Sequence, residues 1–195
     1  RQRQMCIRDR YSDLLVQACV EQGTHYTDIT GENHWVRTLI DKHHDNASIK
    51  GVRVVPSCGY DSIPSDIGSL YTVSQFNKPV KRIDLYQEMQ GGASGGTIET
   101  AFTMGKLSKE MRDPFLLNPE NSVTEEQRKK SKDEMKFKKI EELDAWSGMF
   151  VMAAGNTRVV RRSAALMEQN QKSYGPNFTF GEYGLHKTKK LARRA

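Results

Sequence analysis

The stretch VRVVPSCGYDSIPSDIGSLYTVSQF (residues 52–76) decides the fold, because it passes from an apolar run through a loop into a helical pattern. VRVVP is typical of a strand, and DIGSLYTVSQF has the apolar spacing of a helix. The loop between them, CGYDSIPSDIG (residues 58–68), contains glycine, proline, serine and aspartate, which favour tight turns. The loop could be catalytic, could contact a cofactor, or could serve only as a turn.

The residues before this stretch predict an alternation of helices and strands. YSDLLVQACVEQG (residues 11–23) reads as a helix, THYTDIT (24–30) as a short strand, and HWVRTLIDKHHDNASIKG (34–51) as a second helix. We expect the apolar face of the first helix to contain Leu14, Leu15, Ala18 and Cys19. Strands that alternate with helices of this length predict βαβ units and a parallel sheet.

The pattern changes after residue 78. In VKRIDLYQEMQ (residues 80–90) apolar and polar residues alternate, as in a strand with one solvated face. We therefore predict an α/β chain with a domain boundary between 78 and 79.

Further along, Ser122 and Glu125 predict a capping box for a surface helix, and Asn156 predicts the cap of another helix. The segment NFTFGEYG (177–184) predicts a strand.

Charge and composition narrow the class of protein. The net charge is +6, but the basic residues concentrate at the two ends, so we expect no nucleic-acid partner. Residues 1–10, RQRQMCIRDR, are interpreted as a sequencing or cloning scar, and residues 186–195 as a basic tail. The three cysteines form no metal or disulfide pattern, which favours a reducing, cytoplasmic location and predicts no metal site.

The glycine-rich segment GASGG (residues 92–96) matches the G-x-S-x-G pattern of serine hydrolases, with Ser94 as the nucleophile. That pattern requires an acid and then a histidine further along the chain, and only His186 follows. A hydrolase acting through Ser94 is therefore the least favoured function.

Two loops should lie at the carboxyl ends of the predicted parallel strands, where α/β folds bind ligands. One is TGE (residues 30–32) and the other is the loop 58–68. Glu32, Asp61 and Asp66 would make their rim acidic, which favours a ribose, a nicotinamide or a polar substrate group over a phosphate. The competing interpretation is structural, with Pro64 in the first turn of the following helix and Ser62 or Ser65 as its cap.

Several long segments resemble one known family. GTHYTDITGENHWVRTLIDKHHDNA (residues 23–47), VVPSCGYDSIPSDIG (54–68), SGGT (94–97) and AWSGMFVMAAGNTRVVRRSAAL (145–166) resemble the saccharopine dehydrogenase-like oxidoreductases, which include trans-acting enoyl reductases. The resemblance extends from residue 11 to about residue 185.

The resemblance implies a Rossmann-type domain that binds NAD or NADP, of which residues 11–78 would be the C-terminal part. Residues 79–185 would then be part of an α+β second domain. Because no G-x-G-x-x-G follows a predicted strand, we expect that fingerprint to precede residue 11 in a longer protein, and we expect the chain alone to be inactive.

The resemblance also implies roles for the two loops. Thr30, Gly31 and Gly59 are candidates for contacting the cofactor, and Tyr60 and Asp61 are candidate catalytic residues. The implied substrate is a small molecule or lipid-like compound, and relatives in lipid metabolism suggest association with a membrane surface or a lipid droplet. A non-catalytic lipid-droplet scaffold remains the alternative function.

Overall fold

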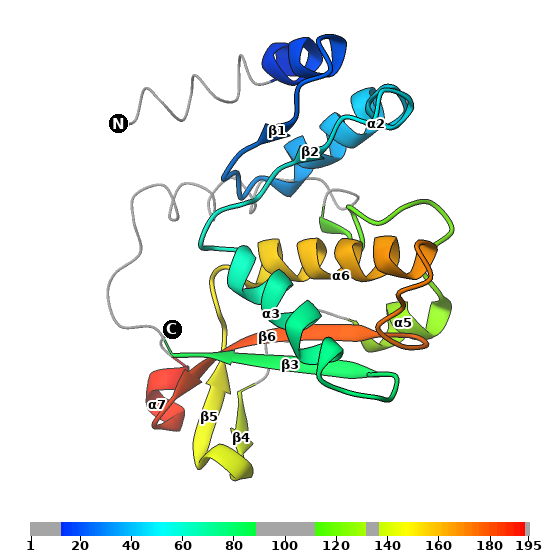
Figure 1. The fold of residues 1–195 in the computed structure, drawn as a ribbon. Helices are drawn as coiled ribbons and strands as arrows, with labels where there is room; N and C mark the ends of the chain where they lie inside the picture. The colour runs from blue at the N-terminus through cyan, green and yellow to red at the C-terminus, as the bar shows by residue number, and fades with distance from the viewer. Residues whose placement is uncertain (1–12, 89–111, 132–136, 194–195) are drawn as a thin grey trace, which may run out of the picture. The chain divides into compact units, whose positions relative to one another are not determined.

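The computed structural model describes residues 13–88, 112–131 and 137–193. The chain divides into two compact units, Arg1–Tyr60 and Asp61–Ala195. Figure 1 traces their helices and strands.

The first unit is a small α/β arrangement. Residues 13–21 are helical, and they precede β1 (Tyr26–Thr27), α2 (Asn33–Ile49) and β2 (Val54–Val55). β1 and β2 pair in parallel, with Tyr26 opposite Val54. The predicted succession of elements and the parallel pairing are both confirmed.

The core of the first unit forms between the helices and the β1–β2 pair. Its buried residues are Val16, Val20, Tyr26, Leu39, Ala47 and Val52. The predicted face of the helix 13–21 was wrong for Leu14 and Leu15, which are 62% and 55% exposed while Val16 and Val20 are buried, but Cys19 of that face does pack against the core. Val16 and Val20 are four residues apart and therefore share one helix face, which sets the direction of packing.

The second unit is a four-stranded mixed sheet with helices. Its strands lie in the order β3-β6-β5-β4, and β3 is parallel to β6 whereas the other neighbours are antiparallel. α3 and α6 lie on the same face of this sheet (Figure 1). The elements are α3 (Ile63–Ser74), β3 (Arg82–Gln87), α5 (Glu125–Lys130), β4 (Lys138–Ile140), a 3-10 turn (Glu141–Leu143), β5 (Ala145–Gly148), α6 (Ala153–Gln169), β6 (Thr179–His186) and α7 (Lys189–Ala192).

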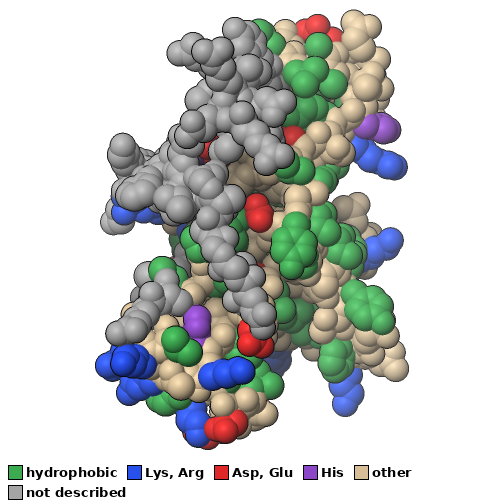
Figure 2. Space-filling view, turned by 90° about the vertical axis from the view of Figure 1, so that its left-hand side faces the viewer, with side chains coloured by type: hydrophobic (Ala, Val, Ile, Leu, Met, Phe, Trp, Pro, Cys, Tyr) green, Lys and Arg blue, Asp and Glu red, His purple; other side chains and the backbone are tan. Residues whose placement is uncertain are grey.

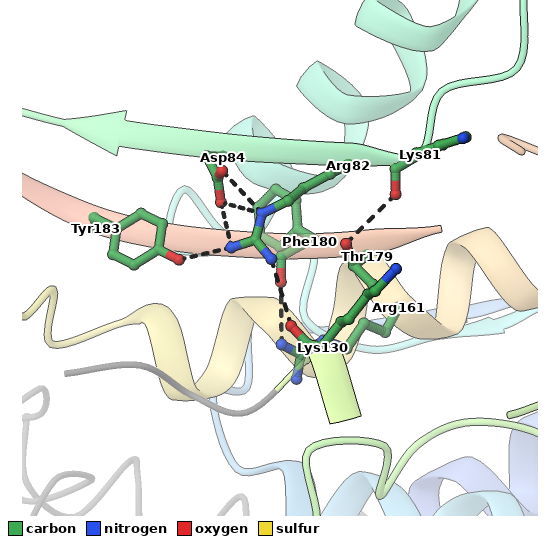
Figure 3. Close-up of polar contacts among 8 residues, drawn as sticks. All are labelled: Lys81, Arg82, Asp84, Lys130, Arg161, Thr179, Phe180 and Tyr183. Atoms are coloured by element: carbon green, nitrogen blue, oxygen red, sulfur yellow. Dashed lines mark hydrogen bonds and ion pairs between the residues drawn. The ribbon is translucent and has the colours of Figure 1, made fainter. Parts of the chain in front are cut away.

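The predicted alternation of β3 is confirmed. Ile83 and Leu85 pack against a core cluster of Val160, Ala164, Tyr174, Phe178 and Phe180. On the opposite face, Arg82 Nε donates to both carboxylate oxygens of Asp84 at 2.9 Å, and Arg82 Nη2 donates to Tyr183 Oη at 3.0 Å (Figure 3). This face of the sheet therefore carries charged and aromatic side chains.

Buried Arg161 of α6 fixes a neighbouring loop to the sheet. Its guanidinium donates to the backbone oxygens of Pro114 at 2.9 Å and Phe180 at 3.0 Å, and the second contact is drawn in Figure 3. The same group lies 5.2 Å from the centroid of the Phe115 ring. Arg161 thus links the residues near 114 to β6, and Arg158 and Arg162 of α6 also donate to carbonyls of the same loop, those of Arg112 and Leu117.

Two predicted helix starts were wrong. α5 is capped by Thr124, whose capping box is completed by Gln127 and does not involve Ser122. α6 begins at Ala153, and Asn156 lies inside the helix with 1% of its surface exposed. Thr124 has the extended backbone that a cap requires, whereas Asn156 uses its side chain in a tertiary hydrogen-bond network.

The division into compact units falls before α3, whereas the predicted domain boundary lies after it, at 78/79. The reason is that Ser62, Ser65 and Asp66 hydrogen-bond to α6 and β6. α3 is therefore built into the second unit.

Hydrophobic side chains also reach the surface, as the green side chains in Figure 2 show. On α3, Ile63, Ile67 and Tyr71 are 38%, 51% and 67% exposed. They are spaced by four residues, so they form one apolar stripe along the helix.

Candidate functional site

The loops that follow β1 and β2 lie side by side in the first unit and are joined through Asp28. Asp28 Oδ1 accepts hydrogen bonds from the backbone N–H groups of Thr30 at 2.9 Å and Ser57 at 3.1 Å. The Tyr26 hydroxyl donates to Asp28 Oδ2 at 2.9 Å, and the Cys58 N–H donates to the Asp28 carbonyl at 2.7 Å. We call this set of contacts the Asp28 junction.

The Asp28 junction brings Thr30 and Gly59 to the same edge of the β1–β2 pair. A Cβ on Gly59 would lie 3.2 Å from the Ile29 Cβ, so the two loops are in close contact at this point. Ser57, just before, has a φ of 63°, a left-handed conformation that a tight turn stabilises. The expectation that the two loops form one rim agrees with this geometry.

The predicted rim residues differ in their surroundings. The Thr30 side chain accepts a hydrogen bond from the Glu32 N–H at 3.2 Å, and Gly31 is partly exposed. Tyr60 is 86% exposed, and Asp61, where the second unit begins, is also exposed. The roles of these residues stay predictions.

Asp66, which the sequence placed on the acidic rim, instead faces α6. Its Oδ2 accepts a hydrogen bond from the Ser163 hydroxyl at 2.9 Å, and its Oδ1 is buried without a hydrogen-bond partner. Burial raises the pKa of Asp66 to about 6, although the Ser163 hydrogen bond acts in the opposite direction.

The serines of the 58–68 loop belong to a buried polar network in the second unit. Ser62 Oγ donates to Asn156 Oδ1 at 3.0 Å, and Ser65 Oγ donates to Glu182 Oε1 at 2.7 Å. Neither serine makes a side-chain capping bond: Ser62 occupies the N-cap position of α3 without one. Ser62 therefore lies at the predicted cap position and Pro64 in the first turn, but the Ser62 hydroxyl bonds to α6 and makes no capping bond.

Glu182 of β6 is the centre of this network. Its Oε1 also accepts hydrogen bonds from Gln87 Nε2 at 2.8 Å and Asn156 Nδ2 at 3.2 Å. Only 5% of Glu182 is exposed, and burial raises its pKa against the opposing effect of these donors. The chain thus holds a buried carboxyl with a hydrogen-bond shell supplied by α3, β3 and α6.

Sequence reasoning missed Asp28 and Glu182, which organise these two regions, and it assigned Asn156 to a helix cap instead of the buried network. Asp28 could have been found from the D-x-T spacing, which is typical of a side chain that turns its own backbone. Glu182 could have been found because it occupies a core-facing position in NFTFGEYG, two residues after Phe180.

Other predictions concern metals, membranes and the hydrolase pattern. In the described ranges, no group of three or more His, Cys, Asp or Glu side chains is arranged to hold a metal ion. Among the helices of those ranges, none has the length and apolar content to cross a bilayer. Ser94 and its glycine-rich segment lie outside the described residues.

These features define an α/β chain with two adjoining loops at the carboxyl ends of its parallel strand pair and a buried carboxyl in its mixed sheet. The chain is homologous to mycobacterial proteins named trans-acting enoyl reductase. A Mycobacterium tuberculosis protein that is named a putative trans-acting enoyl reductase is 34% identical to the chain over 188 residues. This match covers 89% of the chain and 44% of the relative.

Two further relatives carry the name trans-acting enoyl reductase. The Mycobacterium bovis protein is 35% identical over 193 residues, and the Mycobacterium ulcerans protein is 33% identical over 189 residues. In both comparisons the match covers 89% of this chain and 44% of the relative, so the chain spans less than half the length of these relatives. No protein-family model and no solved structure matches the chain.

Proposed function

We propose that the chain is part of an enoyl-reductase-type oxidoreductase of the saccharopine dehydrogenase-like family. It would use NAD or NADP and act on a lipid-like substrate that has a carbon–carbon double bond beside a carbonyl group. The observation that carries this proposal is the homology to proteins named trans-acting enoyl reductase over 89% of the chain. The bound nicotinamide would supply a hydride to the double bond.

The rim of the first unit fits one end of such a cofactor. It lies at the carboxyl ends of two parallel strands, the edge at which open α/β sheets bind ligands. Gly31 has no side chain to keep a flat ring away from the backbone and no atom near its Cβ position, Gly59 lets the two loops approach each other, and Thr30 offers a hydroxyl. Asp28 fixes both loops, so these groups are positioned before a ligand arrives.

The same rim does not fit the pyrophosphate of a dinucleotide. Asp28 and Glu32 make it acidic, and no G-x-G-x-x-G occurs in the sequence. The proposal therefore assigns the rim to the nicotinamide or its ribose. Tyr60 and Asp61 remain the candidates for orienting the substrate or moving a proton.

The test is NMR mapping with the two halves of the cofactor. Nicotinamide mononucleotide should shift the amide signals of Thr30, Gly31 and Gly59, whereas adenosine 2′,5′-bisphosphate should leave them in place. We expect weak affinity, because the chain supplies no pyrophosphate loop. Absence of these shifts at saturating probe, or shifts confined to other residues, would refute the assignment.

A matched pair of variants makes the test specific. Asp28→Asn retains the shape of the side chain but weakens the Asp28 junction, so it should reduce the affinity for nicotinamide mononucleotide. Asp45→Asn, an exposed aspartate on α2, is the control and should leave the affinity unchanged. Equal affinities for the two variants would show that the junction does not support the binding edge.

A further inference from the structure

β3 lies at one edge of the mixed sheet, because the strand order is β3-β6-β5-β4. Among the residues that the structure describes, β6 is the only strand that pairs with β3. A strand at the edge of a sheet presents a row of backbone N–H and C=O groups that can pair with another strand. The residues of β3 and of the neighbouring helix α3 indicate which strand this edge fits.

The pairing with β6 fixes which backbone groups of β3 face outwards. The Thr179 N–H donates to the Lys81 carbonyl at 2.9 Å, and Arg82 lies opposite Thr179 in the parallel ladder. In such a ladder the backbone groups of alternate residues point to the same neighbour, so those of residues 81, 83, 85 and 87 face β6. The N–H and C=O groups of Arg82, Asp84 and Tyr86 therefore point to the open edge.

α3 lies beside this edge. Leu70 and Val73 of α3 pack against the same core cluster as β3, and Figure 1 shows α3 between α6 and β3. On the part of α3 that α6 does not cover, Ile63, Ile67 and Tyr71 form the exposed apolar row described above, which we call the α3 stripe. An unpaired strand edge and an apolar helix surface thus occur together on the second unit.

The charges of β3 fit a second copy of the same strand in antiparallel orientation. Arg82 begins the strand and Glu88 follows its end, and both are exposed. When two β3 strands run antiparallel with Leu85 opposite Leu85, Arg82 of each copy lies opposite Glu88 of the other. Arg82 also donates to Asp84 of its own chain (Figure 3), and the five donors of a guanidinium can serve two carboxylates.

Other arrangements of two β3 strands are less favourable. With the two-fold axis at Asp84 this carboxylate would face its own copy, and with the axis at Tyr86, Asp84 would face Glu88. Like charges directly opposite each other destabilise a sheet. An axis at Ile83 would set the end of the strand against the loop that precedes it. The register centred on Leu85 opposes no like charges.

The same charges disfavour pairing in parallel. Parallel copies in register would set Arg82 against Arg82 and Glu88 against Glu88. Charged residues on an edge strand ordinarily oppose pairing with other strands. In β3 both signs are present, with the cation first and the free anion last, so the order of charges selects an antiparallel copy of β3 itself.

We propose that this edge is the interface between two copies of the chain, in which the β3 strands pair antiparallel about Leu85 and join the two mixed sheets into one. The two-fold symmetry makes the contact between Arg82 and Glu88 twice. The α3 stripes of the two copies lie on the same face of the joined sheet and cover each other, which removes their apolar side chains from water. The interface is independent of the proposed function, because the cofactor rim contains none of these residues.

Sedimentation equilibrium and amide exchange of the full chain test this interface. We expect a monomer–dimer equilibrium. The Asp84 and Tyr86 amides should be protected in the dimer and lose protection on dilution, whereas the Leu85 amide, which faces β6, should stay protected. A chain that is monomeric up to about 1 mM would overturn the proposal. Protection of the Asp84 and Tyr86 amides in the monomer would also overturn it, because another segment of the chain would then cover the edge.

Charge and surface variants test the two parts of the interface. Glu88→Arg turns two attractive contacts into two repulsive ones and should weaken dimerisation by about tenfold. Ile67→Glu places a charge in the α3 stripe and should weaken it as well. Glu120→Arg, an equal change of charge at an exposed position before α5, is the control. Dissociation constants for Glu88→Arg and Ile67→Glu that equal that of Glu120→Arg would contradict the interface.

A disulfide tests the register, in a background in which serine replaces the native cysteines. Leu85→Cys sets two thiols directly opposite each other across the axis, in a non-hydrogen-bonded pair, where the side chains are closest. Mild oxidation should link this dimer covalently. Ile83→Cys, on the same face of the strand, lies opposite Gln87 of the second copy and should not link. A folded Leu85→Cys protein that does not link, or Ile83→Cys that links equally well, would show that the register is wrong. If Leu85→Cys does not fold, the Glu88→Arg result decides.

Discussion

The buried carboxyl of Asp66 makes the stability of the second unit depend on pH in a defined direction. Burial raises its pKa from 3.8 to about 6, so folding favours the protonated form. The stability associated with this group is complete below pH 3.8, falls as the pH rises through about 6, and changes little above that. The shift corresponds to a loss of about 3 kcal/mol, taken as an upper value because Asp66 is only half-buried.

Asp66→Asn removes the ionisation and retains the size of the side chain. The amide brings its own cost, because a buried N–H₂ would replace Oδ1, which has no partner. That cost does not vary with pH, so the difference in unfolding free energy between the variant and the parent is the informative quantity. It should change in favour of the variant by about 1–3 kcal/mol between pH 4 and pH 7.5.

Urea unfolding at a series of pH values measures this difference. A Trp35→Phe background leaves Trp146 as the reporter, and Trp146 belongs to the second unit. Asp61→Asn, an exposed aspartate just before the same helix, serves as the control and should change stability little. A difference that stays constant over this pH range, or that moves in favour of the parent, would refute the assignment of Asp66 as a buried acid.

Four further substitutions test the packing and the hydrogen-bond networks. Gly175→Ala should destabilise the protein by more than about 3 kcal/mol in chemical unfolding, because its φ is 154° and a Cβ would lie 2.3 Å from the Val80 carbonyl oxygen. Gly68→Ala is its counterpart in open space within α3, and its melting temperature should rise, corresponding to about 0.5–1 kcal/mol. Ser65→Ala should cost about 1–3 kcal/mol in urea unfolding, since it leaves a buried carboxyl short of a donor; a loss below 0.5 kcal/mol, roughly that of a surface change, would contradict the network. Asp28→Ala should abolish amide-exchange protection of the Thr30 and Ser57 N–H groups, and retained protection would show that the Asp28 junction is not formed.

The order of helices and strands could be predicted because periodicity is a local property of the sequence. The strand at β6 and the parallel pairing of β1 with β2 both follow from apolar runs and their spacing. The exposed Leu14 and Leu15 show where this reasoning stops, because a helix with several apolar residues has more than one possible face. Packing against the rest of the unit selected the face with Val16 and Val20.

The candidate site could be predicted only where its contacts join residues that are close in the sequence. The rim could be predicted from two loops after two strands, and Asp28 bonds to Thr30 two residues away. The contact between Ser62 and Asn156 joins residues that are 94 positions apart, so the capping propensity of serine and asparagine does not reveal it. Tertiary hydrogen bonds of this kind leave no local pattern.

The central proposal is that this chain is a working part of an enoyl reductase. The most direct measurement replaces the aligned region of the Mycobacterium bovis relative with this chain and follows the oxidation of NADH or NADPH with S-crotonyl-N-acetylcysteamine as substrate. Circular dichroism and the parent relative provide the controls for folding and for activity. The account predicts turnover in the folded chimera. A folded chimera that binds the cofactor but forms no reduced thioester, while the parent does, would contradict the claim.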